Sequence, residues 1–227
     1  MRTGSVAAQL AARHPRLYHQ MPTGLWESVA AHGLLPPRLL LERIHQPPAV
    51  IDQLTRTPRP ETVVIEPTPL GRVAISDNKP LSETALERCL DDGLTPADWC
   101  AMLAERVFFW THERDLRGLL AARSIRDQAR DVLVIDTLGF VRAHAGRVEL
   151  SPINSGSTIR TPARRGLGTY AKLLEVESLR EWRERRMRAG VKTSLDEVKE
   201  LVVRGAADVA PFVVERRRYE GGSYAVV

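Results

Sequence analysis

Residues 131–136 read Asp-Val-Leu-Val-Ile-Asp and give the clearest strand signal in the chain. Four consecutive apolar, mostly β-branched residues are typical of a strand that is buried on both faces. Residues 107–110, Val-Phe-Phe-Trp, have the same character. Both runs are far shorter than the roughly 18 apolar residues of a membrane-spanning helix. The two segments therefore predict a buried β-sheet at the centre of the fold and no membrane partner.

Further strands and helices are predicted on both sides of these runs. The strands are expected at residues 16–20, 62–65, 71–76, 147–150, 198–203 and 212–215. The helices are expected at residues 5–13, 23–32, 38–44, 48–54, 82–90, 95–106, 111–122 and 179–187. Short strands separated by helices of varied length predict an α+β fold rather than a regular βαβ series.

Local signals support several of these elements. Thr95-Pro96-Ala97-Asp98 is a helix start, with a threonine cap, a proline at the first position and an acid at the third. Gly33 stands where a left-handed residue would end the helix at 23–32. The strands at 62–65 and 71–76 are expected to pair as a hairpin.

The composition indicates one domain over residues 1–227. The chain has 227 residues, of which 43% are hydrophobic and 27% are charged, enough to build a sizeable core. Residues 151–170, rich in Pro, Gly, Ser and Thr, are expected to form a long loop. Residues 171–227 are expected to be a basic C-terminal part that carries the last strands.

The cysteine content and the N-terminal segment bear on compartment and metal binding. Cys89 and Cys100 cannot form a disulfide framework or a four-ligand zinc site by themselves, and we expect both to be buried. No metal site is predicted. The first residues lack a long apolar stretch, so we expect a soluble, cytoplasmic protein. No Gly-rich phosphate loop follows a predicted strand.

The excess of basic over acidic side chains lies in the last third of the chain. The formal net charge is +5, and residues 151–227 carry 15 basic and 10 acidic side chains. Most of the basic residues are arginines, whose planar guanidinium groups suit phosphate. Two interpretations stay open: a solvated surface with interleaved glutamates, or a footprint for DNA, RNA or a dinucleotide phosphate.

A first motif spans residues 17–35. It reads Leu17-Tyr18-His19-Gln20-Met21, then Trp26-Glu27-Ser28-Val29, then His32-Gly33-Leu34-Leu35. A lone histidine is often structural, but this segment resembles the first strand and helix of the ADP-ribosyltransferase superfamily. The branch that modifies DNA, which has Tyr-His-x-Thr, is more similar than the poly(ADP-ribose) polymerase branch. Gln20-Met21 occupies the place of the family's Gly-Thr.

The resemblance implies a role in NAD binding for this motif. In that superfamily the histidine bonds the adenosine ribose of NAD, so the resemblance assigns Tyr18, His19 and Gln20 to NAD binding. It also implies a fold of short-stranded, split β-sheets flanked by helices.

A second motif reads Arg106-Val107-Phe108-Phe109-Trp110-Thr111-His112-Glu113-Arg114. The apolar residues alone are equally expected of a core strand. In the toxin branch a similar aromatic strand is followed by a catalytic arginine. The resemblance implies that Phe109 or Trp110 lines the nicotinamide pocket, where a π-face suits a cationic ring. It implies that Arg114 or Arg106 is the arginine.

A third feature is a glutamate on a late strand. Cleavage of the nicotinamide–ribose bond develops positive charge on the ribose, as in glycoside hydrolysis, and a nearby carboxylate can stabilise it. Glu200 begins an apolar strand, as in the toxin branch, and is our candidate for this role. Glu197 is the weaker candidate. The alternative is a polar residue on the wet face of an edge strand.

The loop Ser151-Pro152-Ile153-Asn154-Ser155-Gly156-Ser157-Thr158 is the most distinctive one. Asn and Gly are turn formers, so a structural turn is one explanation. Asn154 and Ser155 could instead contact NAD phosphates or a nucleotide. Together with the preceding motifs, this loop resembles a family of uncharacterised bacterial proteins of about this length.

Three functions remain open at this point. The first is an NAD-dependent mono-ADP-ribosyltransferase that acts on a macromolecule, with DNA or RNA as the expected acceptor and a protein as the alternative. The second is an RNA 2′-phosphotransferase, which would use Arg13, His14, Arg16 and the cluster Arg160–Arg165. The third is a non-catalytic binding protein on the same fold. The sequence does not indicate an oligomeric state.

Overall fold

The computed structural model describes residues 2–122, 125–159, 162–188 and 198–227. An eight-stranded sheet has the order β10-β9-β5-β1-β4-β8-β6-β7, with antiparallel neighbours throughout. Its strands are β1 (Arg16–Pro22), β4 (Arg106–Trp110), β5 (Arg130–Asp136), β6 (Val148–Ser151), β7 (Ala171–Lys172), β8 (Glu200–Arg204), β9 (Val213–Glu220) and β10 (Ser223–Val226). A small second sheet pairs β2 (Val63–Ile65) with β3 (Val73–Ile75).

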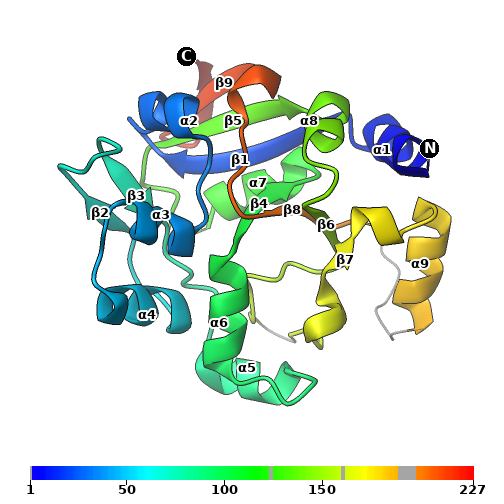
Figure 1. The fold of residues 1–227 in the computed structure, drawn as a ribbon. Coiled ribbons are helices and arrows are strands. Elements are labelled where there is room, and N and C mark those ends of the chain that lie inside the picture. The colour runs from blue at the N-terminus through cyan, green and yellow to red at the C-terminus, as the bar shows by residue number, and fades with distance from the viewer. Residues whose placement is uncertain (1, 123–124, 160–161, 189–197) are drawn as a thin grey trace.

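The helices surround the sheet on both faces (Figure 1). They are α1 (Arg2–Arg13), α2 (Trp26–His32), α3 (Pro37–Arg43), α4 (Pro48–Arg56), α5 (Glu83–Cys89), α6 (Pro96–Ala104), α7 (Glu113–Leu120), α8 (Thr137–Ala143) and α9 (Leu179–Arg188). The main core packs α1, α2, α8 and α9 against one face. On the other face, α5 and α6 pack against β4 and β8, whereas α7 packs against β5 and β9. Helices α3 and α4 share a separate small core with β2 and β3.

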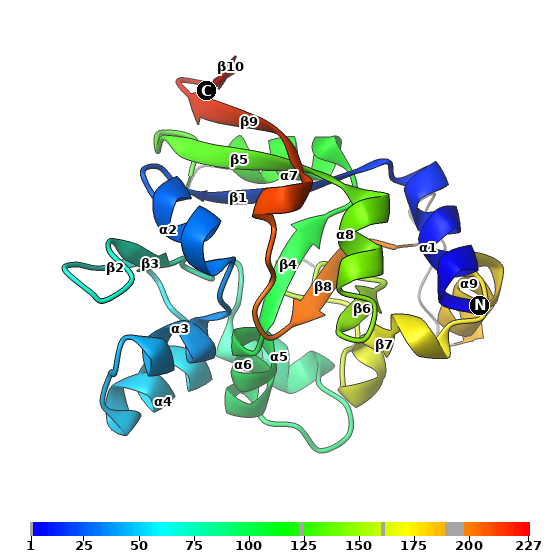
Figure 2. The ribbon, with the colours of Figure 1, turned by 45° about the horizontal axis from the view of Figure 1, so that its top comes forward.

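The large sheet is divided into two halves between β1 and β4. Strand β1 pairs with β5 along its whole length, but among the described residues it pairs with β4 only at Tyr18 and Trp110. Figure 2 shows β4 and β8 crossing the direction of β1 and β5 at a steep angle. The eight-stranded sheet thus has two four-stranded halves that diverge from one residue pair.

Most of the elements predicted from the sequence are confirmed. The chain is α+β, β5 is buried along almost its whole length, and β2 and β3 form the expected hairpin. Thr95 and Asp98 form the predicted reciprocal cap of α6. Cys89 and Cys100 are free and buried. Within the part of the chain that the structure describes, no helix is long and apolar enough to cross a membrane.

Gly33 ends α2 as predicted, but in a different conformation. Its φ of 74° is positive, whereas its ψ of 177° is extended rather than left-handed helical. The next residue, Leu34, exchanges backbone hydrogen bonds with Ala207, the N–H to O distances being 2.8 and 2.9 Å. A Cβ atom on Gly33 would lie 2.8 Å from the Ala207 carbonyl oxygen. Glycine is therefore required both by the dihedral angle and by this close approach.

Helix α8 and the strands β7 and β10 were absent from the sequence prediction. Helix α8 follows β5 directly, and the Asp136 side chain caps it by accepting a bond from Gly139 N at 2.9 Å. Strand β10 turns back on β9 through Gly221 and Gly222, which both have positive φ. Strand β9 is also longer than expected, because it continues through the basic run that follows Glu215.

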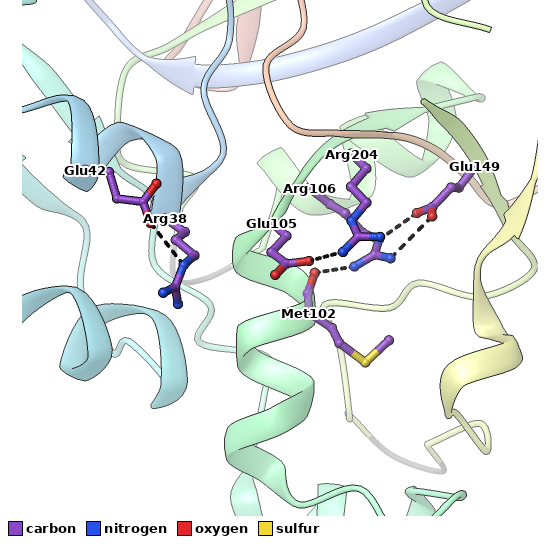
Figure 3. Close-up of polar contacts among 7 residues, drawn as sticks. All are labelled: Arg38, Glu42, Met102, Glu105, Arg106, Glu149 and Arg204. Carbon is purple, nitrogen blue, oxygen red and sulfur yellow. Dashed lines mark hydrogen bonds and ion pairs between the residues drawn. The ribbon is translucent and has the colours of Figure 1, made fainter. Parts of the chain in front are cut away.

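A buried ion pair joins the two strands that flank β8 (Figure 3). Arg106 on β4 donates to Glu149 on β6 at 2.7 Å and to the Met102 carbonyl at 2.7 Å, and both charged side chains are 7% exposed. The guanidinium also lies 4.3 Å from the centre of the Tyr170 ring. The nearby pair between Arg204 and Glu105, 3.0 Å apart, is exposed.

We predict that Glu149→Leu lowers the free energy of unfolding by about 3–5 kcal/mol, because it leaves Arg106 buried without its counter-charge. Glu105→Leu is the matched control, and it should cost at most about 1 kcal/mol, as is usual for exposed pairs. Urea denaturation of both variants measures the difference. Equal losses of stability would contradict the structural role given to the buried pair.

Candidate functional site

A cavity of about 340 Å³ opens where the two halves of the sheet diverge. Its walls come from β1, β4, the segment from α2 to α3, β3 and the loop after β6. The lining includes six residues singled out from the sequence, namely His19, Gln20, Phe109, Trp110, Asn154 and Glu200. Four segments that are far apart in the chain therefore meet at one site.

The pairing register explains how these motifs come together. Tyr18 on β1 is opposite Trp110 on β4, Trp110 is opposite Glu200 on β8, and Glu200 is opposite Ser151 on β6. The four residues form one row across four strands. The row includes the residue pair that joins the two halves of the sheet, so Glu200 lies beside the point of divergence.

Glu200 is buried and held by the distinctive loop. Its side chain is 4% exposed, and its Oε2 accepts bonds from Ser155 N at 3.1 Å and Ser155 Oγ at 2.6 Å. Burial raises the pKa of Glu200 to about 7, against the opposing effect of the Ser155 bonds. The carboxyl group therefore exchanges its proton near neutral pH.

Arg165 fixes the loop that presents Ser155. Its buried guanidinium donates to the carbonyl oxygens of Ser155 and Ser157, both at 3.0 Å, and the indole N–H of Trp99 also donates to Ser155 O at 3.3 Å. With its carbonyl oxygen bound on one side, Ser155 directs its N–H and hydroxyl group to Glu200. Arg165 thus has a positioning role that its place in a basic run did not indicate.

His19 faces the cavity as a neutral ring. Its Nδ1 lies 2.8 Å from the carbonyl oxygen of Phe108, and burial lowers its pKa. A carbonyl oxygen can only accept, so Nδ1 carries the hydrogen and Nε2 is left as an acceptor. The ring also lies 5.6 Å from that of Phe109, centre to centre. The site therefore holds one neutral acceptor on β1 and one carboxyl group on β8.

The two aromatic candidates differ in accessibility. Phe109 is fully buried and its ring lies 4.8 Å from that of Phe140 in the main core. Trp110 is only partly buried: it packs against the α7 core beside Tyr18, yet unlike Tyr18 it also lines the cavity, and it belongs to the row that contains Glu200. Trp110 is therefore the better placed of the two to stack on a ligand.

Several predicted site residues lie away from the cavity. Tyr18 packs with the α7 core on the opposite face of β1 from His19, and Ser155 lies behind Glu200. Arg114 is exposed on α7 and is outside the cavity lining of the described chain. Arg106 lines the cavity, but its guanidinium is bound to Glu149.

Glu197 and Arg160 fall outside the described residues.

Several of the described arginines in the last third of the chain are engaged within the protein. Arg164 pairs with Asp91, and Arg165 is buried. On β9, Arg217 pairs with Glu113 and Glu215, and Arg218 pairs with Asp131 at 2.9 Å. These ion pairs account for part of the positive charge without an external partner.

Residues proposed for a phosphotransferase also lie elsewhere. His14, the residue directly after α1, is 2% exposed, and Arg16 pairs with Asp136 at 3.2 Å. Neither is among the described residues that line the cavity. Three arginines that the motif analysis did not select, Arg59, Arg72 and Arg130, do line it. In the sequence, Arg130 is marked only by its position directly before the strongest strand run, residues 131–136.

The fold and site define an α+β protein with a cavity at the division of its main sheet, lined by a neutral histidine, an indole and a buried carboxyl group. Within the described ranges, no group of three or more His, Cys, Asp or Glu side chains could hold a metal ion. Residues 15–212 match the model of DUF7002, a family of unknown function, and the chain belongs to that family. No curated protein and no solved structure matches the chain.

We predict that Glu200→Gln changes the pH dependence of stability. The raised pKa means that the native state binds a proton more tightly than the unfolded state, so the wild type loses stability as pH rises from about 4.5 to 7. The variant lacks this loss. The difference in free energy of unfolding between Glu200→Gln and the wild type should therefore grow with pH. It should be near zero at pH 4.5 and should reach as much as about 3 kcal/mol in favour of the variant at pH 8.

Urea denaturation at several pH values measures this difference. Glu87→Gln, at an exposed position on α5, is the control and should follow the wild type. Parallel curves for the wild type and Glu200→Gln would show that the carboxyl group has an ordinary pKa.

Proposed function

We propose that the protein is an NAD-dependent mono-ADP-ribosyltransferase that acts on a macromolecule. The observation that carries this proposal is the convergence of His19, Trp110 and Glu200 on one cavity. These are the residues that the resemblance to the ADP-ribosyltransferase superfamily assigns to the adenosine ribose, the nicotinamide ring and the reacting ribose. They come from strands far apart in the sequence, so their convergence is not a consequence of one local motif.

His19 suits the binding of a ribose hydroxyl group. With Nδ1 committed to the Phe108 carbonyl oxygen, Nε2 can only accept a hydrogen bond. A hydroxyl group of the adenosine ribose can donate to it. Because burial lowers the pKa of His19, the ring stays neutral at physiological pH and keeps this acceptor.

Trp110 suits the nicotinamide ring. The ring is cationic in NAD and loses its charge when the bond to ribose breaks. An indole face attracts a cation and stacks on a flat ring. Trp110 is opposite Glu200 in the pairing register, so a ring held against the indole places its ribose close to the carboxyl group.

Glu200 suits the stabilisation of the developing ribose cation. In the proposed step the bond from C1′ to the nicotinamide nitrogen breaks, and nicotinamide leaves with the electron pair. The carboxylate accepts a bond from the ribose 2′-hydroxyl and stabilises the positive charge. The acceptor then adds its lone pair to C1′ and loses a proton. Ser155 keeps the carboxyl group in place through two hydrogen bonds.

The acceptor is proposed to be DNA or RNA, on the basis of the basic C-terminal part. The ion pairs made by Arg217 and Arg218 reduce the charge available to a polyanion. DNA, RNA and protein acceptors are therefore tested together.

A second candidate is a protein that binds NAD without cleaving it. It is favoured by Gln20-Met21 in place of Gly-Thr and by the protonation of Glu200 near neutral pH.

We expect the purified protein to release nicotinamide from NAD. The rate of release should rise when the correct acceptor among DNA, RNA and protein is added. Glu200→Gln should lower that rate by about 100-fold to 1,000-fold, the usual effect of losing one transition-state contact, and should leave NAD affinity within a few fold. Nicotinamide release is followed by chromatography and NAD affinity by calorimetry. Glu87→Gln is the control and should behave as the wild type.

The outcomes separate the candidates. Equal release by the wild type and Glu200→Gln would remove the catalytic role from this residue. If NAD binds but no nicotinamide is released with DNA, RNA or protein present, the protein is the second candidate, which binds NAD without cleaving it. An absence of both binding and release would overturn the two candidates together.

A further inference from the structure

Arg130 is a buried arginine whose hydrogen-bonding capacity is largely unused. It is the first residue of β5 and is 2% exposed. Its Nη2 donates to the Gln128 side chain at 2.5 Å, but Nε and Nη1 are buried and have no hydrogen-bond partner in the described structure. A buried charge without partners destabilises a fold, so such a group calls for an explanation. Asp77 lies near enough to attract the guanidinium but forms no hydrogen bond with it among the described residues.

Arg130 faces the same cavity as His19 and Glu200. It is opposite Pro22 in the pairing of β1 with β5, and Gln20 is two residues from Pro22 on the same face. Diagonal neighbours of this kind are within reach of long side chains. The Oε1 atom of Gln20 is also buried without a partner. Two polar side chains with unsatisfied atoms therefore stand at diagonal positions on one face of neighbouring strands, and both line the cavity.

The charged side chains that line the cavity are mainly positive. Arg59 and Arg72 line the cavity together with Arg130. Arg59 is bound to the Ser76 carbonyl oxygen at 3.2 Å, and Arg72 lies 3.6 Å from Glu66 at its exposed side. Of the two acids in the lining, Asp77 accepts from Thr62 at 3.2 Å and Glu200 is held by Ser155. An anion in the cavity would therefore meet more positive than negative side chains.

We propose that Arg130 binds a phosphoryl group of the ligand that occupies the cavity, through its Nε–H and Nη1–H groups. These two donors lie on different edges of the guanidinium plane, so the two oxygens of one carboxylate cannot reach both. The oxygens of a diphosphate can. Arginine is the side chain best suited to such charge-assisted bonds. This inference rests on the proposed function, in which the diphosphate of NAD supplies the phosphoryl groups.

The test compares Arg130→Met with the wild type by calorimetry against three probes. Inorganic pyrophosphate and ADP-ribose carry the phosphoryl groups, and nicotinamide riboside does not. We expect the variant to bind the first two about tenfold to a hundredfold more weakly, as for the loss of bonds to a charged group. It should bind nicotinamide riboside as the wild type does. Arg43→Gln, at an exposed position on α3, is the matched control.

A second readout separates ligand binding from a structural role. Removing a buried charge that lacks partners is neutral or stabilising, so Arg130→Met without ligand should unfold at the same temperature as the wild type or higher. Gln20→Glu places a carboxylate one diagonal step from the guanidinium. That variant should raise the unfolding temperature and abolish pyrophosphate binding, because an internal anion then occupies Arg130. If Arg130→Met does not fold, the Gln20→Glu variant still tests whether Arg130 binds pyrophosphate.

The outcomes distinguish this inference from the proposed function. Equal binding of pyrophosphate and ADP-ribose by the wild type and Arg130→Met would overturn the phosphate site and leave the proposed function standing. Pyrophosphate binding that depends on Arg130, with no binding of ADP-ribose or NAD, would support the phosphate site and overturn the proposed function. If the wild type binds none of the phosphate-containing probes, both are overturned.

Discussion

The pairing of Tyr18 with Trp110 is the interaction on which the rest of the structure depends. It is the point where the two halves of the sheet meet, and the strands diverge on one side of it. The cavity occupies the space that this divergence opens. Because antiparallel pairing aligns residues across strands, the same row continues to Glu200 and Ser151. One backbone contact thus sets both where the cavity lies and which carboxyl group it contains.

Polar groups are buried in two different ways around this point. Arg106 and Glu149 satisfy each other, and their role is to hold β4 and β6 across β8. Arg130 is buried without such compensation, and Glu200 has its pKa raised by burial. Arg130 and Glu200 therefore lower the free energy of unfolding, and both line the cavity. The large shared core beneath α1, α2, α8 and α9 offsets that cost.

The sequence predicted the elements whose signals are local. Strand β5 follows from its apolar run, and α6 follows from the cap formed by Thr95 and Asp98. Glu200, His19 and Trp110 were selected through resemblance, and the structure brings them to one cavity. The exposed position of Arg114 and the opposite orientation of Tyr18 depend on register and on the packing of α7, which short motifs do not encode. The sequence marks Arg130 only by its position directly before the β5 run, whereas its burial and its two unpartnered nitrogens are properties of the tertiary structure.

The most direct test of this cavity as the NAD site is nuclear magnetic resonance of the tryptophan indole N–H groups during titration with NAD. The four tryptophans sample different places: Trp110 lines the cavity, Trp99 lies behind the Ser155 loop, Trp26 contacts Arg216, and Trp182 is in the main core. We predict that the Trp110 signal shifts with saturation while those of Trp26 and Trp182 stay in place. Shifts confined to Trp26 or Trp182, or no shift at any indole, would contradict the assignment of the cavity.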